Sequence, residues 1–118
     1  MGTFRVRIEV GNPQGERFQA VEALVDTGAT NTTLPAPVLR DLGVEPYRKS
    51  VFELADGRQL ELELGRTWVR VDGQQEFTQV VFGPPGSGPI LGAITLEEMN
   101  LSVDPVAERL VPVHRYLM

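Results

Sequence analysis

One carboxylate of this chain lies in a context that suits catalysis. In the segment Ala23-Leu24-Val25-Asp26-Thr27-Gly28-Ala29-Thr30, an apolar run leads directly into Asp26 and small residues follow it. A carboxylate can take a proton from water, and a neighbouring protonated carboxyl can donate one to a substrate oxygen. Two carboxyls about 3 Å apart share a single proton, because like charges disfavour the second ionisation. Asp26 is therefore a candidate for one half of a catalytic carboxyl pair.

Other catalytic chemistries lack the residues that they need. The chain has no Cys, which excludes disulfides, thiolate nucleophiles and thiolate metal sites. It has one His, His114, so a Ser-His-Asp triad would have to use that residue. A zinc site would need ligands that the chain scarcely has. We therefore expect carboxylate catalysis without a metal or another cofactor.

Charge and hydropathy narrow the set of partners. The net charge is −5 and no block of Lys or Arg is present, whereas nucleic-acid binding relies on clustered cations. No apolar run approaches the roughly 18 residues that span a bilayer. Residues 1–10 alternate Arg with apolar residues and lack the apolar core of a secretory signal. We expect one cytoplasmic domain over residues 1–118 that binds neither nucleic acid nor membrane.

The segments before Asp26 have the pattern of two strands. Apolar residues alternate with Arg and Glu from Phe4 to Val10, which predicts a half-buried strand. The sequence Gly11-Asn12-Pro13-Gln14-Gly15 is typical of a turn. A second strand is predicted over 18–25, and it runs directly into Asp26. The catalytic candidate is thus expected at the end of a strand.

Two short helices and two hairpins are predicted after Asp26. Pro35 and Pro37 favour the start of a helix that ends at Gly43, and Thr95 is predicted to cap a helix over 95–100. Asp-Gly turns predict hairpins over 50–64 and 68–82, with positive φ at both turn residues. The remaining predictions are a loop over 83–89, an interruption of regular secondary structure over 103–105 and a last strand over 109–113. The expected fold class is all-β with one or two short helices.

Three segments together resemble the retropepsin-like family, the single-domain aspartic proteases of clan AA. They are Leu24-Val25-Asp26-Thr27-Gly28-Ala29, the hairpin centred on Asp56-Gly57, and Ile90-Leu91-Gly92 leading into a helix. The resemblance covers roughly Phe4 to Val113. It implies a closed acid-protease barrel with a flap hairpin and one lobe per chain. Since the chain has one Asp-Thr-Gly, it also implies a homodimer with an Asp26 from each subunit at the two-fold axis.

The resemblance also implies a role for each matching residue. In the Asp26 loop, Thr27 would form hydrogen bonds across the dimer axis, Gly28 would allow a tight turn, and Ala29 would line the cleft. Two further groups would bind substrate. The flap tip would consist of Ala55, Asp56 and Gly57. An apolar subsite wall would be formed by Ile90 and Leu91. The implied activity is endopeptidase cleavage of extended peptides.

Two positions depart from the pattern of the viral members. Thr30 and Ala93 stand where those enzymes usually have an acidic and a basic residue, so the viral style of subunit contact is not expected. The departures suggest a cellular relative and leave two alternatives open. One is a catalytically inactive dimeric peptide-binding or regulatory module of the same fold. The other is a small β-barrel in which Asp-Thr-Gly is coincidental and Asp26 caps a turn.

Overall fold

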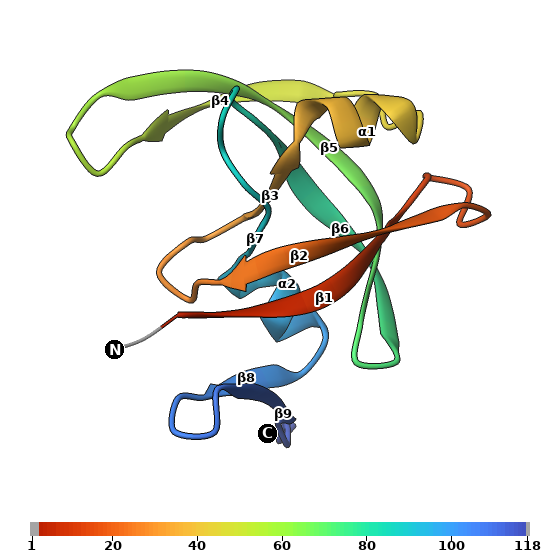
Figure 1. Ribbon diagram of the computed structural model, residues 1–118, viewed down its shortest axis with the longest axis vertical. Coiled ribbons are helices and arrows are strands. Elements are labelled where there is room, and N and C mark those ends of the chain that lie inside the picture. The colour runs from red at the N-terminus through yellow and green to blue at the C-terminus, as the bar shows by residue number, and fades with distance from the viewer. Residues whose placement is uncertain (1–2, 118) are drawn as a thin grey trace.

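The computed structural model describes residues 3–117 (Figure 1). In this range the strands are β1 (Phe4–Gly11), β2 (Phe18–Val25), β3 (Thr32–Pro35), β4 (Arg48–Glu53), β5 (Gln59–Val71), β6 (Gln74–Gly83), β7 (Ile90–Leu91), β8 (Leu101–Asp104) and β9 (Arg109–Pro112). The helices are α1 (Ala36–Asp41) and α2 (Ala93–Glu98). The predicted fold class, mostly β with two short helices, is confirmed. Each helix has six residues, and neither is long and apolar enough to cross a membrane.

Seven of the strands form one sheet that closes on itself. Their order is β1-β2-β7-β3-β6-β5-β4, and β1 also pairs with β5 through Glu9↔Arg70 and Val10↔Val69. This extra pairing joins β1, β2, β7, β3, β6 and β5 into a ring, and β4 continues beyond it at an edge. The ring is the closed barrel that the family resemblance implied. Closure matters because the β1–β5 pairs leave less unpaired strand edge than an open sheet of the same strands would have.

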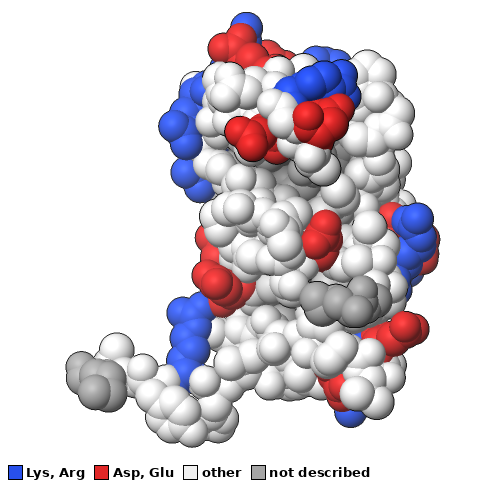
Figure 2. All heavy atoms as spheres, turned by 90° about the vertical axis from the view of Figure 1, so that its left-hand side faces the viewer, with Lys and Arg blue, Asp and Glu red and all other residues white. Residues whose placement is uncertain are grey.

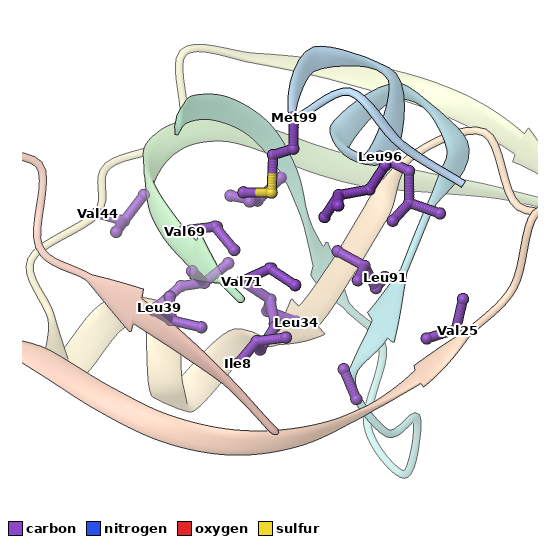
Figure 3. Packing of buried hydrophobic residues seen from close by; sticks show 14 of the residues in the cluster. Ile8, Val25, Leu34, Leu39, Val44, Val69, Val71, Leu91, Leu96 and Met99 are labelled. Atoms are coloured by element: carbon purple, nitrogen blue, oxygen red, sulfur yellow. The ribbon is translucent and has the colours of Figure 1, made fainter. Parts of the chain in front are cut away.

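The interior of the ring holds one apolar core. Figure 3 shows side chains from strands and from both helices meeting there. The most deeply buried include Val10, Leu34, Leu39, Val69, Val80, Leu91 and Met99, each with no measurable exposure. Leu39 comes from α1 and Leu96 from α2, so each short helix is anchored to the barrel by a leucine in the core. Burying a side chain of this size stabilises the fold by about 1.5–3 kcal/mol.

The two predicted hairpins form, with different turns. Between β5 and β6, Asp72 and Gly73 have φ of 50° and 78°, as a two-residue type I′ turn requires. Between β4 and β5, Gly57 has φ of 87° but Asp56 does not have positive φ, so that part of the prediction was wrong. The loop there has three residues, closed by hydrogen bonds from Leu54 N–H to Arg58 O and from Gly57 N–H to Leu54 O. A three-residue loop needs one left-handed residue, and Gly57 supplies it.

The predicted start of α2 was also wrong. The helix begins at Ala93 after Gly92, and Thr95 is fully buried inside it. The first N–H groups of α2 are satisfied by backbone carbonyls: Ala93 N–H donates to Ala29 O at 2.8 Å, and Ile94 N–H donates to Thr30 O at 3.0 Å. A side-chain cap is therefore unnecessary. The Asp26 loop itself caps this helix.

Two four-residue strands were not predicted. β3 pairs in parallel with β6, and β8 pairs with β9 in a separate two-stranded sheet. The predicted break over 103–105 falls at the end of β8, while the predicted last strand is confirmed as β9. The helix predicted after Pro35 is confirmed as α1, which is followed by Gly43 at φ of 77°.

Candidate active site

Backbone hydrogen bonds fix the end of β2 and with it Asp26. Leu24 and Val25 pair in parallel with Ile90 and Leu91 of β7. Beyond the strand, Asp26 N–H donates to Leu91 O at 3.1 Å. The next turn is closed by Ala29 N–H, which donates to Asp26 O at 3.1 Å. The candidate catalytic residue therefore lies in a loop whose backbone is held from two sides.

The side chain of Asp26 is oriented by one further contact. Its Oδ1 accepts a hydrogen bond from Gly28 N–H at 2.9 Å. Among the described residues, none donates to Oδ2, and Asp26 is half-buried. A Cβ at Gly28 would lie 3.2 Å from this same Oδ1, with no other neighbour within 4 Å. One carboxylate oxygen is thus held by the loop, and the other is available to water or to a second carboxyl.

Gly92 supports the Asp26 loop from below. A Cβ on this residue would lie 2.4 Å from Asn31 O, closer than real contacts permit, and 3.0 Å from Ala29 O, which is tighter than most real contacts. Only glycine therefore allows β7 and α2 to approach the loop this closely. The sequence resemblance included this glycine, and the structure gives the physical reason for it.

A cleft of about 760 Å³ opens beside Asp26. It lies between the Asp26 loop, the β4–β5 hairpin and the segment that precedes β7. It is lined by Asp26, Gly28, Ala29, Thr30, Asn31, Thr33, Val51, Phe52, Glu53, Leu54, Ala55, Leu62, Val81, Pro84, Ser87 and Ile90. A concave site with mainly apolar walls and a few polar groups is typical of ligand-binding clefts.

The cleft brings together five of the residues singled out from the sequence. Asp26, Gly28, Ala29, Ala55 and Ile90 all line it. The other four do not line it in this chain: Thr27, Asp56, Gly57 and Leu91. Of these, Leu91 has no exposed surface because successive residues of a strand face opposite ways, and Ile90 takes the cleft side. The remaining three are exposed.

Several cleft residues were not singled out from the sequence. Phe52, Leu54 and Leu62 were predicted as alternating apolar residues of a hairpin, without a role in the site. Their alternation could have indicated a role in the site, because a hairpin that projects from the barrel has no core of its own, and its apolar side chains must face another surface. Thr33 and Asn31 belong to β3 and its approach, and β3 itself was not predicted.

The tip of the β4–β5 hairpin carries a close ion pair. Arg58 N–H donates to Asp56 Oδ1 at 3.0 Å, and Arg58 Nε lies 2.7 Å from Asp56 Oδ2. The backbone hydrogen bond and then the guanidinium hold the pKa of the Asp56 carboxyl below its ordinary value. Figure 2 presents the left-hand side of Figure 1, and acidic and basic side chains gather at the top of that face.

The comparisons with known proteins agree with this geometry. A family model described as aspartyl protease matches residues 6–95. The solution structure of simian foamy virus (mac) protease superposes with a TM-score of 0.58 and 19% sequence identity, covering 80% of this chain and 92% of that one. No curated protein is detectably similar in sequence. At this identity the superposition concerns the fold, and it confirms the retropepsin-like architecture.

Proposed function

Because this chain belongs to the aspartyl protease family, we propose that it is an aspartic endopeptidase whose active site contains Asp26 from each of two identical subunits. The observation that carries the proposal is the position of Asp26: its carboxylate lies in a backbone-bonded loop at the wall of an apolar cleft, with one oxygen bound to Gly28 N–H and the other without a donor among the described residues. A catalytic carboxyl needs both a fixed position and an open oxygen.

The chemistry follows from a pair of such groups sharing one proton. The ionised Asp26 takes a proton from a water molecule held between the two carboxyls, and the water oxygen attacks the peptide carbonyl carbon. The protonated Asp26 donates to the carbonyl oxygen, so a neutral tetrahedral intermediate forms. Proton transfer to the peptide nitrogen then allows the C–N bond to break. No covalent enzyme intermediate is required.

The surface elements that support a homodimer lie on one side of the molecule. The Asp26 loop, the tip of the β4–β5 hairpin and the β8–β9 turn all reach the left side of Figure 1, which is the face shown in Figure 2. Thr27 is exposed beside Asp26, where it could bond to its copy across an axis. A two-fold axis through this face would oppose identical Asp26 loops, since an isologous interface pairs each residue with the same surface patch.

The substrate that fits the cleft is an extended peptide with apolar side chains. β4 is the edge strand of the large sheet, and its hairpin supplies Phe52 and Leu54 to the cleft. Extended peptides bind by backbone hydrogen bonds to such edges, with alternate side chains in pockets. We propose that the β4–β5 hairpin acts as the flap, with Ala55, Asp56 and Gly57 at its tip, and that its closure excludes bulk water.

The test compares the wild type with Asp26→Asn on a mixed peptide pool between about pH 4 and 7. The Asn side chain can still accept from Gly28 N–H, so the loop should keep its conformation, while proton exchange with water is lost. We expect cleavage to fall by about 10²–10⁴-fold, the scale of general acid–base catalysis. Equal cleavage by the two proteins would refute the proposal.

A second candidate keeps the fold and the dimer without catalysis. Thr30 and Ala93 favour it, because both are uncharged and both lie where α2 receives the Asp26 loop. A peptide-binding or regulatory module would capture peptides by the same edge and cleft but would not turn them over. Capture by both the wild type and Asp26→Asn, with no products by mass spectrometry, would select this candidate over the endopeptidase.

A further inference from the structure

Three threonine hydroxyls meet in the interior, beneath the Asp26 loop. They come from three elements: Thr32 from β3, Thr78 from β6 and Thr95 from α2, and none has any exposed surface. Thr32 Oγ1 lies 2.6 Å from Thr95 Oγ1, and Thr95 Oγ1 lies 3.1 Å from Thr78 Oγ1. Burying hydroxyls is costly unless each is hydrogen-bonded. Hydrophobic packing alone therefore does not explain why three hydroxyls are buried at this place.

Both ends of this cluster have partners of a definite kind. At the outer end, Thr78 Oγ1 donates to Glu98 Oε1 at 2.6 Å. At the inner end, Gly92 N–H donates to Thr32 Oγ1 at 3.1 Å. The five groups form a continuous chain from a surface carboxylate to one backbone amide. In the described residues, no buried side-chain polar atom lacks a partner.

The direction of every bond in the chain follows from counting protons. A carboxylate only accepts, so Thr78 uses its one proton on Glu98. Thr95 must then donate to Thr78, and Thr32 must donate to Thr95. The Thr32 oxygen is left to accept from Gly92 N–H. All four hydrogen bonds thus point the same way, and bonds aligned in this manner polarise and strengthen one another.

The inner end of the chain lies at the joint that supports Asp26. Gly92 has no free space on the side of Asn31 and Ala29. Its neighbours on either side make the backbone contacts of the loop: Leu91 O accepts from Asp26 N–H, and Ala93 N–H donates to Ala29 O. A small shift of Gly92 would therefore move both anchors of the Asp26 loop.

We propose that Thr32, Thr78, Thr95 and Glu98 are positioning residues, which fix Gly92 and so hold the Asp26 loop through a one-directional hydrogen-bond chain. The catalytic consequence rests on the proposed endopeptidase function, whereas the effect on the loop does not. Catalytic groups must be held within about 0.5 Å of their working geometry, and a chain that joins three elements at one backbone amide supplies such restraint.

The experiment compares Thr95→Val with Thr95→Ser, because valine keeps the shape and removes the hydroxyl while serine keeps the hydroxyl. Amide hydrogen exchange, followed by NMR, is measured at Asp26, Gly92 and Ala93. We expect Thr95→Val to accelerate exchange there by about tenfold, the scale of one lost buried hydrogen bond, and Thr95→Ser to restore protection. On a cleaved peptide, kcat should fall with KM little changed.

A matched control separates positioning from general loss of stability. Thr67 is equally buried and donates to Gly11 O outside this chain of bonds. Thr67→Val should lower stability without selectively exposing the amides of Asp26, Gly92 and Ala93. If both valine variants accelerate exchange at those amides to the same extent, the chain has no local role and the proposal is wrong.

A second pair of variants acts at the exposed end, where the fold is least at risk. Glu98→Gln keeps an acceptor oxygen for Thr78, whereas Glu98→Leu removes it. We expect wild-type protection for Glu98→Gln and faster exchange at Gly92 for Glu98→Leu. Unchanged exchange in both Glu98→Leu and Thr95→Val would overturn the positioning role. Absence of peptide cleavage by the wild type would instead refute the endopeptidase and leave the exchange test intact.

Discussion

Asp26 is held mainly through its backbone. Its N–H donates to Leu91 O, its own carbonyl accepts from Ala29 N–H, and among residues 3–117 its side chain makes one hydrogen bond, with Gly28 N–H. This division suits the proton exchange that we propose for Asp26. A carboxylate with every lone pair bound to donors would be a poor base, because those bonds favour the charged form. Fixing the main chain leaves one oxygen free to react.

At the same scale, Gly92 should be the glycine least tolerant of a side chain in the site. In Gly92→Ala, the new methyl would meet backbone atoms of Asn31 at 2.4–2.5 Å, and the backbone there cannot yield cheaply. We expect a loss of about 1–3 kcal/mol in the free energy of unfolding, as for other overpacked sites.

Gly88→Ala is the matched control, since a Cβ at Gly88 has no neighbour within 4 Å. Urea unfolding followed by circular dichroism gives both free energies under the same conditions. Equal midpoints for the two variants would show that Gly92 is not confined.

At the scale of elements, the β4–β5 hairpin combines a turn closed by hydrogen bonds with an edge strand. Its three-residue loop is closed by two backbone hydrogen bonds and by the Asp56–Arg58 pair. Within the part of the chain that the structure describes, β4 pairs with β5 alone, so its other edge is open to the extended peptide that we propose as substrate. Motion of this hairpin is therefore expected at its base, where the strands join the barrel, rather than within the turn.

The titration of Asp56 tests how the hairpin tip is closed. Its pKa lies below the ordinary 3.8 in the folded protein, so the contact stabilises the turn above that pH and is lost as pH falls through the lowered value. NMR titration of the Asp56 carboxyl should show this low midpoint. Arg58→Gln should raise the midpoint only partly, because the backbone hydrogen bond is the larger cause. Full return to the ordinary value would contradict that order.

At the scale of the whole molecule, closure of the sheet decides where a partner can sit. The β1–β5 pairing closes the ring around the core, while the Asp26 loop and the hairpin tip remain on one outer face (Figure 1). In the proposed function, a single chain supplies one Asp26 carboxyl and one flap hairpin. The proposed site is complete only when a second copy covers that face.

Mixing subunits tests this requirement directly. Wild-type protein is equilibrated with an equal amount of Asp26→Asn protein before assay. If two Asp26 residues make one site, random pairing places about half of the wild-type chains in mixed, inactive dimers. Cleavage should therefore fall to about half of that given by the same wild-type amount alone, and fall further with excess mutant. Activity that is independent of added mutant, together with a monomer in sedimentation, would contradict the shared site.

Local patterns predicted much of the architecture. The alternation over β1 and the two Asp-Gly hairpins depend on neighbours only a few residues apart, and the structure confirms them. The misses have different causes: β3 pairs with the distant strand β6, whereas β8 pairs with the nearby strand β9. β3 and β8 are four residues long, too short for a periodic pattern, and each exists because another strand lies beside it. Thr95 has the residue type of a helix cap, yet its hydroxyl bonds to Thr32, 63 residues away.

By itself, the sequence determined the family resemblance, the strand that delivers Asp26 and the turn that follows it, because these depend on residue type and on short-range backbone preference. Only the tertiary structure decided which residues share the cleft: Ile90 faces it while its neighbour Leu91 faces the core. It also decided that three buried hydroxyls form one chain ending at Gly92. Such choices depend on which segments pack together, and packing joins residues that spacing along the chain does not relate.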